Sequence, residues 1–204
     1  MKLPRSISMA AIPVLFLFIS SQGILAASSQ DSAATVGFYE NNPDGDLTLD
    51  SVPGLDFGSQ KISLSDEAYN SLNLTPFIQV TDNRSINNAT GWNVTVKASP
   101  FTSTTSTSTL NGATINFSNG DSTSDLTYTK PTTIPFVVTT DGDVGTVKVV
   151  SAKQGEGRGT WKTSWLPTTS NPATNDSVTL HVPGGIMANE QYTSTLTWTL
   201  SNTP

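Results

Sequence analysis

The feature that most constrains the fold is the alternation within residues 192–204, YTSTLTWTLSNTP. Positions 193, 195, 197 and 199 are all threonine, and the residues between them are mostly large or apolar. Period two places successive side chains on opposite faces of a strand, and β-branched threonine favours that conformation. We therefore predict a half-buried strand whose larger side chains, including Leu196 and Trp198, face the core.

Short alternating segments recur along the chain, separated by turn residues, and no segment shows a sustained 3.6-residue period. This pattern predicts an all-β, single-domain β-sandwich or barrel-like antiparallel fold with long surface loops. Residues 66–74 are predicted as one short helical turn. A hairpin is predicted across Asp141-Gly142. The expected strands lie near 34–39, 47–49, 55–57, 62–64, 76–81, 92–98, 110–120, 134–138, 144–150, 160–166, 177–182 and 192–200.

The first 26 residues differ from the rest. Lys2 and Arg5 give a positive start, residues 9–19 are almost continuously apolar, and small residues allow cleavage after Ala26 or Ala27. This pattern predicts a secretory signal peptide, because the apolar run is too short to span a membrane. After cleavage we expect a secreted protein without a membrane-spanning segment.

The small polar residues 27–34 are expected to form a flexible N-terminal segment. Residues 35–204 have a length that suits one folded domain. No basic or apolar anchor follows the last predicted strand. We therefore expect the folded domain itself to make the contacts that retain the protein.

The charge balance excludes some partners. Removing Lys2 and Arg5 from the ten basic residues leaves eight against sixteen acidic ones, a formal charge of −8. Nucleic acid and anionic membrane surfaces bind clustered lysine and arginine, so neither is expected as a partner. The chain has no cysteine, and its stability must therefore come from its own core rather than from disulfides.

Trp92-Asn-Val94 and Leu196-Thr-Trp198-Thr-Leu200 share one form, a tryptophan followed two residues later by an aliphatic residue. Together with the predicted signal peptide, they resemble the WxL family of Gram-positive surface proteins. The family's terminal motif is Tyr, three residues, an aliphatic residue, Thr-Trp, one residue, Leu, three residues and Pro. This chain matches it at Tyr192, Leu196, Thr197, Trp198, Leu200 and Pro204. The earlier motif is Trp92-Asn-Val94, where valine replaces the family's leucine. Other stretches that resemble the family are Leu55-Asp-Phe57-Gly58, Val80-Thr-Asp82-Asn-Arg84, Gly159-Thr-Trp161, Ser164-Trp165 and Val182-Pro-Gly-Gly185.

The resemblance implies a non-catalytic domain attached non-covalently to the cell wall, at the cell surface, with peptidoglycan as the expected ligand. It also implies larger surface assemblies that involve membrane-anchored partner proteins. The alternative function is therefore a structural or interaction subunit, or an adhesin, that binds such a partner or a host matrix protein. Strand addition at an exposed sheet edge would be one way to bind it. A glycan hydrolase is a third hypothesis, although the sequence marks no pair of catalytic acids.

The signature tryptophans have two interpretations. In a strand, a large ring beside an aliphatic side chain two residues on is typical of a sandwich core. The same ring face could instead stack on the C–H groups of a sugar. Tryptophan is highly buried on average, which favours the core. The family-motif residues predicted as core are Trp92, Val94, Tyr192, Leu196, Trp198 and Leu200.

A second aromatic pair, Trp161 and Trp165, is the candidate binding site. Both rings fall on one face of a predicted strand that follows the glycine-rich residues 153–159, and Arg158 and Lys162 lie beside them. Aromatic rings with neighbouring cations would suit a wall polymer that carries sugars, carboxylates or phosphates. The other interpretation is that one of the rings closes the end of the sandwich.

No residue set predicts an enzyme, a metal site or a cofactor. The single histidine, His181, alternates with apolar neighbours and is expected to face away from them. One histidine without cysteine cannot build a histidine-rich metal site or a Cys-His nucleophile. Asp44-Gly-Asp46 and Asp141-Gly-Asp143 coincide with turns, where Asp-Gly is favoured for backbone reasons rather than for Ca²⁺ binding.

Overall fold

The structure, a computed structural model, describes residues 46–141 and 145–204. The predicted signal peptide, the expected flexible segment and the expected strand at 34–39 lie outside these described residues. Within them the chain forms only β-strands, paired antiparallel, which confirms the all-β prediction. The strands are β1 (Leu47–Ser51), β2 (Glu67–Ser71), β3 (Phe77–Asp82), β4 (Trp92–Ala98), β5 (Thr102–Ser103), β6 (Thr114–Phe117), β7 (Gly120–Thr123), β8 (Thr132–Thr133), β9 (Phe136–Thr139), β10 (Val147–Ala152), β11 (Gly159–Trp165), β12 (Asn175–Val182), β13 (Tyr192–Thr193) and β14 (Leu196–Ser201).

One layer is made of long antiparallel ladders with a break in the middle. β2 leads into β3, and the later segment 159–182 pairs with both strands. β11 pairs with β3, and β12 pairs with β2. On the other side of segment 159–182, β7 pairs with β11 and β6 pairs with β12. The break is the excursion 166–174, opposite the short link 72–76. β1 and β9 add the outer strands, beside β3 and β6 respectively.

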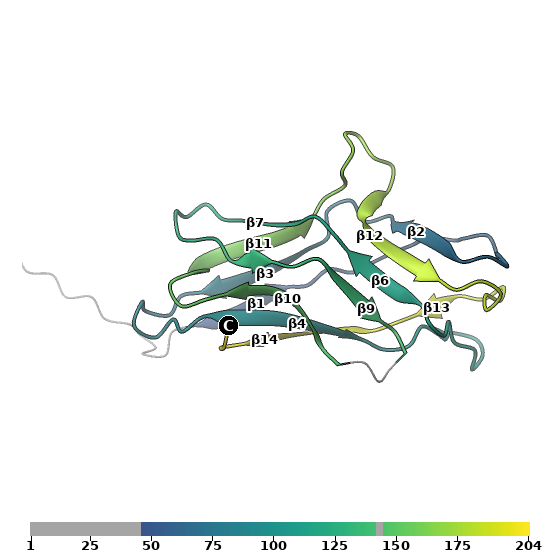
Figure 1. Ribbon diagram of the computed structural model, residues 1–204, viewed down its shortest axis with the longest axis horizontal. Coiled ribbons are helices and arrows are strands. Elements are labelled where there is room, and N and C mark those ends of the chain that lie inside the picture. The colour runs from purple at the N-terminus through teal and green to yellow at the C-terminus, as the bar shows by residue number, and fades with distance from the viewer. Residues whose placement is uncertain (1–45, 142–144) are drawn as a thin grey trace, which may run out of the picture. The chain divides into compact units, whose positions relative to one another are not determined.

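The other layer is built around β4, which is paired on both sides. β14 pairs with β4 from Leu196↔Ala98 to Ser201↔Asn93, and β13 with β5 extends this ladder. β10 pairs with the opposite side of β4, and β8 with β10. β1 lies beside β14 and β7 beside β8, so the two layers approach each other along both edges. In Figure 1, β3 and β11 lie above β4 and β14, as expected for a sandwich.

A single apolar cluster fills the space between the layers. Phe117 of β6 stacks on Phe136 of β9 with ring centroids 4.5 Å apart, and Trp165 of β11 meets Phe117 edge-on at 5.1 Å. Trp198 of β14 lies 6.2 Å from both Phe117 and Trp165. Such offset and edge-on contacts are the favoured geometries between aromatic rings. The cluster therefore ties the terminal strand to the opposite layer.

The helical turn predicted at 66–74 is wrong, because most of that segment is the strand β2. Its side chains alternate between partly buried Tyr69 and exposed neighbours, and β2 pairs with β12 along its length. Asp66, the first residue of the predicted turn, accepts a hydrogen bond from the amide of Gly184 over 2.9 Å. Strand pairing and the burial of one face here outweigh the local helix preference of a few residues.

The hairpin predicted across Asp141-Gly142 is also wrong. β9 pairs with β6 in one layer, whereas β10 pairs with β4 and β8 in the other. The chain changes layers between β8 and β9, at Pro135. Proline has no N–H to continue a ladder, so the strand that follows it is free to join the other sheet. The link after β9 therefore connects two layers rather than two neighbouring strands.

Candidate functional site

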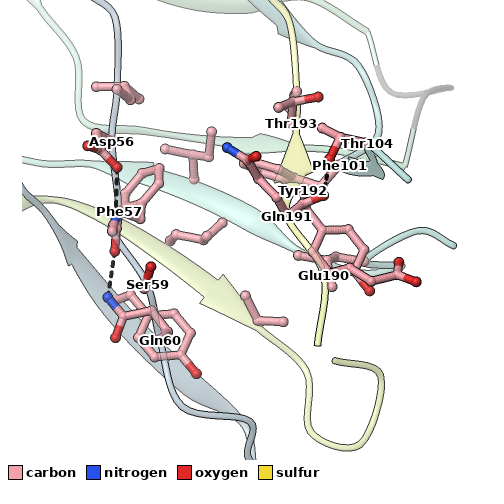
Figure 2. Close-up of a pocket in the computed structure, with 18 of the residues that line it drawn as sticks. Asp56, Phe57, Ser59, Gln60, Phe101, Thr104, Glu190, Gln191, Tyr192 and Thr193 are labelled. Carbon is pink, nitrogen blue, oxygen red and sulfur yellow. Dashed lines mark hydrogen bonds between the residues drawn. The ribbon is translucent and has the colours of Figure 1, made fainter. Parts of the chain in front are cut away.

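An elongated groove opens between the outer side of β13–β14 and residues 52–62, which run from β1 toward β2. We call it the edge groove. Its volume is about 1220 Å³, and it is lined by all of residues 52–62 and by β13–β14 as far as Trp198. Figure 2 shows Asp56, Phe57 and Gln60 on one side and Glu190, Gln191 and Tyr192 on the other. Ligand sites are usually concave and largely preformed, with a mostly apolar lining and a few placed polar groups.

The floor of the edge groove is part of the sandwich core. Ile115 of β6 and Leu180 of β12 are buried core residues that also line the groove. From the other layer, Leu196 and Trp198 of β14 contribute partly buried side chains. Because β14 and β2 are edge strands of their sheets, no strand covers the space between them. The core therefore reaches the surface here.

Residues 52–62 form one wall without joining a sheet. Leu55 and Phe57 are partly buried against the core, and the residues between and around them are exposed. The two side chains therefore share a face, although the strands expected at 55–57 and 62–64 are absent from the described structure. The main-chain oxygen of Asp56 accepts from the amide of Leu72 over 2.7 Å, and its amide donates to Asn73 Oδ1 over 2.7 Å. These bonds fix the wall to the end of β2.

The facing rim is organised around the carboxylate of Glu190. Ser106 Oγ and Ser108 Oγ donate to Glu190 Oε2 over 2.8 and 2.6 Å. Hydrogen bonds from Ser108, then Ser103 and Ser106, lower the pKa of Glu190, because they stabilise the ionised carboxylate. Ser108 Oγ also lies 3.3 Å from the hydroxyl of Tyr192. The Ser/Thr-rich run 102–109 is thus hydrogen-bonded to the groove rim.

The outer edge of β14 faces the edge groove with its backbone. In an antiparallel pair, residues alternate between those bonded to the partner strand and those whose N–H and C=O point away from it. Ser99 N donates to Thr195 O over 2.9 Å, which places Thr195 and, two residues on, Thr197 toward β4. Leu196 and Trp198 therefore direct their backbone groups outward. Among the described residues, no backbone hydrogen bond outside the strand ladders reaches either of them.

Trp198 carries a further unusual feature. Its indole nitrogen is buried and has no hydrogen-bond partner among the described residues. A buried N–H without an acceptor is destabilising, because it loses its bond to water without replacement. The ring itself lines the edge groove, although its nitrogen is covered.

The family-motif residues lie in or against the core. Trp92 and Val94 of β4 are both 0% exposed, and Trp92 Nε1 donates to Gly157 O over 3.1 Å. The other four are partly buried and pack on the core cluster: Tyr192, Leu196, Trp198 and Leu200. Three of these four also line the edge groove, namely Tyr192, Leu196 and Trp198.

Trp161 and Trp165, the candidate binding pair, are both buried in the structure. They are 5% and 1% exposed, because β11 lies between β3 and β7 and turns alternate side chains inward. Trp165 belongs to the aromatic core, and Trp161 Nε1 donates to Arg158 O over 2.8 Å. Neither indole face is therefore open to a sugar. Lys162 is exposed on the opposite face, with its ammonium 4.1 Å from the centroid of Phe77.

Arg158 lies apart from the edge groove, in a network that supports the loop 84–91. Its guanidinium donates twice to Arg84 O, over 3.0 and 3.2 Å, and sits 5.2 Å from the ring centroid of Tyr128. Arg84 in turn forms a buried ion pair with Asp82 at 2.8 Å and donates to Gly91 O. This arrangement fixes the loop that precedes Trp92, so part of the predicted binding set has a structural task.

Sequence reasoning did not identify the main elements of the edge groove. Asp56, Gln60 and Glu190 come from two loops distant in sequence, and no spacing links them. The one available signal was the Ser/Thr-rich run 102–109, which carries hydroxyl groups and no apolar face. Two of its serines bind Glu190 in the structure. His181 lies outside the groove lining and is exposed, as predicted.

The described residues show neither a metal-ligand cluster nor a membrane-spanning helix. In residues 46–141 and 145–204, no three His, Asp or Glu side chains gather in a way that could hold a metal ion. The same residues contain no helix long and apolar enough to cross a membrane. Asp141, from one of the Asp-Gly-Asp turns, accepts a hydrogen bond from the amide of Gly112 over 2.7 Å.

Comparison with known proteins places the chain in a family. No curated protein and no solved structure gives a significant match. The family model described as WxL domain surface cell wall-binding matches residues 29–204. That match spans nearly the whole chain and includes both tryptophan motifs, the edge groove and the buried network around Arg84. The chain therefore belongs to the WxL family of surface cell wall-binding domains.

Proposed function

We propose that this protein is secreted, is not an enzyme, and attaches non-covalently to peptidoglycan through the edge groove. Membership of a cell wall-binding family supports wall attachment as the task. The observation that carries the choice of site is the groove itself, where the core opens between hydrogen-bonding rims. Phe57 and Tyr192 can contact the apolar faces of a bound polymer, while hydroxyls, amides and carboxylates on the rims can bind its polar groups.

The carboxylates of the groove support binding rather than hydrolysis. A glycosidase needs one carboxylic acid that stays protonated near neutral pH, which requires a raised pKa. The pKa of Glu190 is lowered instead, by hydrogen bonds from serine hydroxyls. Asp56 Oδ1 accepts from the amide of Gly58 over 2.8 Å, which is a turn contact. Neither group is arranged as a general acid.

Sedimentation with purified peptidoglycan tests the proposal. We expect the wild-type protein to sediment with the wall and Phe57→Ala to sediment less, because the apolar contact on one wall is lost. Ile86→Ala is the matched control, since Ile86 is exposed and lies outside the groove lining. Both variants should keep a cooperative thermal transition. Equal sedimentation of Phe57→Ala and the control would overturn the choice of site, and wild-type protein that stays in solution would overturn wall binding.

A further wall contact at Arg158 and Lys162 remains a proposal. Lys162 is exposed, so its ammonium could reach an anionic group on the wall, whereas Trp161 and Trp165 would contribute only by supporting β11. Lys162→Gln should then weaken wall binding more at low salt than at high salt, because exposed charge interactions are screened. A variant that sediments like wild type at every salt concentration would remove Lys162 from the contact.

A second candidate function is that of an interaction subunit in a surface assembly. The observation that favours it is a set of exposed apolar side chains near the start of β2 and along the link to β3. They are Val52, Ile62, Leu64, Leu72 and Leu74, and Leu64 is 89% exposed. Exposed apolar surface of this kind often marks a protein contact. Co-purification of a surface protein with wild type but not with Leu64→Ser would support this role. Equal co-purification with both proteins would exclude it.

A further inference from the structure

We propose that the edge groove binds the peptide part of the wall polymer rather than its glycan chain, with the peptide laid as an added strand along β13–β14. This inference rests on the proposed wall attachment and names the chemical group that the groove contacts. Three features of the groove support it: the backbone edge, the spacing of the apolar floor, and the charges of both signs.

The backbone edge is suited to a peptide. Leu196 and Trp198 direct N–H and C=O groups outward, spaced two residues apart along the strand. An extended peptide presents its own N–H and C=O groups at the same repeat, because a strand rises about 3.4 Å per residue. Main-chain bonds of this kind provide affinity when a peptide adds to a sheet edge. A sugar chain has no groups with that repeat.

The floor suits small side chains that alternate in direction. Leu180 and Val182 of β12 line the groove beneath the edge of β14, and Phe57 closes the far side. A strand added beside β14 would turn alternate side chains toward this floor. Methyl groups, such as those of alanine residues in a short wall peptide, could then be buried without hydroxyl groups that would need new partners.

The charges favour a ligand that carries both an amine and a carboxylate. Asp56 and Glu190 lie on opposite rims, and Lys61 is the single basic residue among the described residues of the lining. A polyanion would meet two carboxylates and one ammonium, which is unfavourable, and a neutral glycan would use none of these charges. A wall peptide with a free amino group and a terminal carboxylate can pair with both signs. Charge complementarity therefore selects the peptide among the wall components.

The test compares three preparations from one wall. We expect the protein to bind intact peptidoglycan and soluble peptides released from it by an amidase, and to bind the glycan strands left behind at least about tenfold more weakly. Failure to bind intact peptidoglycan would overturn the proposed function itself. Equal binding to intact wall and to peptide-free glycan would leave that function standing and overturn this inference. Binding of an extended segment from a protein at this edge, without binding of wall peptides, would also overturn it.

Hydrogen exchange gives a residue-level readout of strand addition. With the soluble wall peptide bound, the amides of Leu196 and Trp198 should exchange at least about tenfold more slowly, because they gain hydrogen-bond partners. The amide of Thr197, which already faces β4, should change little. Peptide binding that leaves the exchange of Leu196 and Trp198 unchanged would refute the added strand.

Charge variants test the rims. Asp56→Asn keeps the acceptor for Gly58 but removes the charge, and we expect about fivefold weaker binding of the peptide. Asp125→Asn is the matched control, because Asp125 is exposed and outside the groove lining. Acetylating the peptide amine should abolish the difference between wild type and Asp56→Asn. A difference that persists with the acetylated peptide would refute the role of Asp56 as the partner of the amine.

Discussion

Replacing Trp92 by phenylalanine tests whether the family's signature residue acts in the core or on the ligand. Trp92 is fully buried on β4, lies outside the edge groove lining, and its indole N–H bonds the carbonyl of Gly157. Phenylalanine removes that donor and leaves a buried carbonyl without its partner, which costs about 1–3 kcal/mol. The smaller ring leaves part of the site empty and costs about 1 kcal/mol more. The free energy of unfolding should fall by about 3 kcal/mol.

Thermal and urea unfolding measure this loss. For a domain of this size, about 3 kcal/mol corresponds to a Tm lower by about 6–12 °C. The urea midpoint should fall with an unchanged slope, since the surface exposed on unfolding is nearly the same. Ile86→Ala, an exposed side chain away from the core, should stay within about 0.5 kcal/mol of wild type.

Wall binding separates the two roles of Trp92. Measured well below the lowered Tm, sedimentation of Trp92→Phe with peptidoglycan should equal that of wild type, because no ligand contact has been removed. The result that refutes this reasoning is a variant with a wild-type transition and reduced wall binding. It would show that the signature tryptophan contacts the ligand in a conformation other than the one described.

Three further predictions address other parts of the molecule. Trp198→Ala removes the ring that meets Phe117 and lines the groove, so we expect about 2–4 kcal/mol lower stability in urea unfolding; a native transition with wall binding abolished would contradict this. Asp82→Asn leaves the buried guanidinium of Arg84 without its anion and should cost about 3–5 kcal/mol, whereas a loss below about 1 kcal/mol would show that the ion pair is dispensable. Glu190 has a folded pKa below its ordinary value of 4.5, so its anchoring of the 102–109 loop is present above pH 4.5 and lost as pH falls through the folded value. Amide chemical shifts of Ser108 should follow that titration in wild type and not in Glu190→Gln, and a pH-independent wild type would refute it.

The strands could be predicted wherever one face of the strand is buried and the other is exposed to solvent. The alternation in β4, β11 and β12 reports directly on which side chains enter the core, and it located these strands to within a residue or two. The single strand expected at 192–200 is instead divided into β13 (Tyr192–Thr193) and β14 (Leu196–Ser201). It could not show which strands pair. Pro135 separates β8 from β9 and sends them to different layers, while the Asp-Gly turn nearby indicated a local hairpin. Pairing between distant strands depends on packing that a local turn signal does not contain.

The edge groove could not be predicted from the sequence, because it forms between loops that are distant in sequence and are brought together only by the fold. Glu190 is brought to Ser106 and Ser108 only by the pairing of β13 with β5, and Asp56 is placed by its bonds to residues that follow β2. For a related reason, the sequence left two interpretations open for the tryptophan pair on β11. Alternation placed both rings on one face but did not say which face was covered, and that depends on the layer opposite.

The pairing of β14 with β4 also has a consequence for the order in which the protein can fold. Leu196 meets Ala98, about 100 residues earlier in the chain, so β4 lacks its partner on one side until β14 has been made. Contacts this distant in sequence slow folding, because a long loop must close before they form. In the secreted protein that we propose, this delay would keep the chain unfolded while it crosses the membrane. Pairing of β14, the strand that carries the family motif, would then determine when the domain is folded and able to bind the wall.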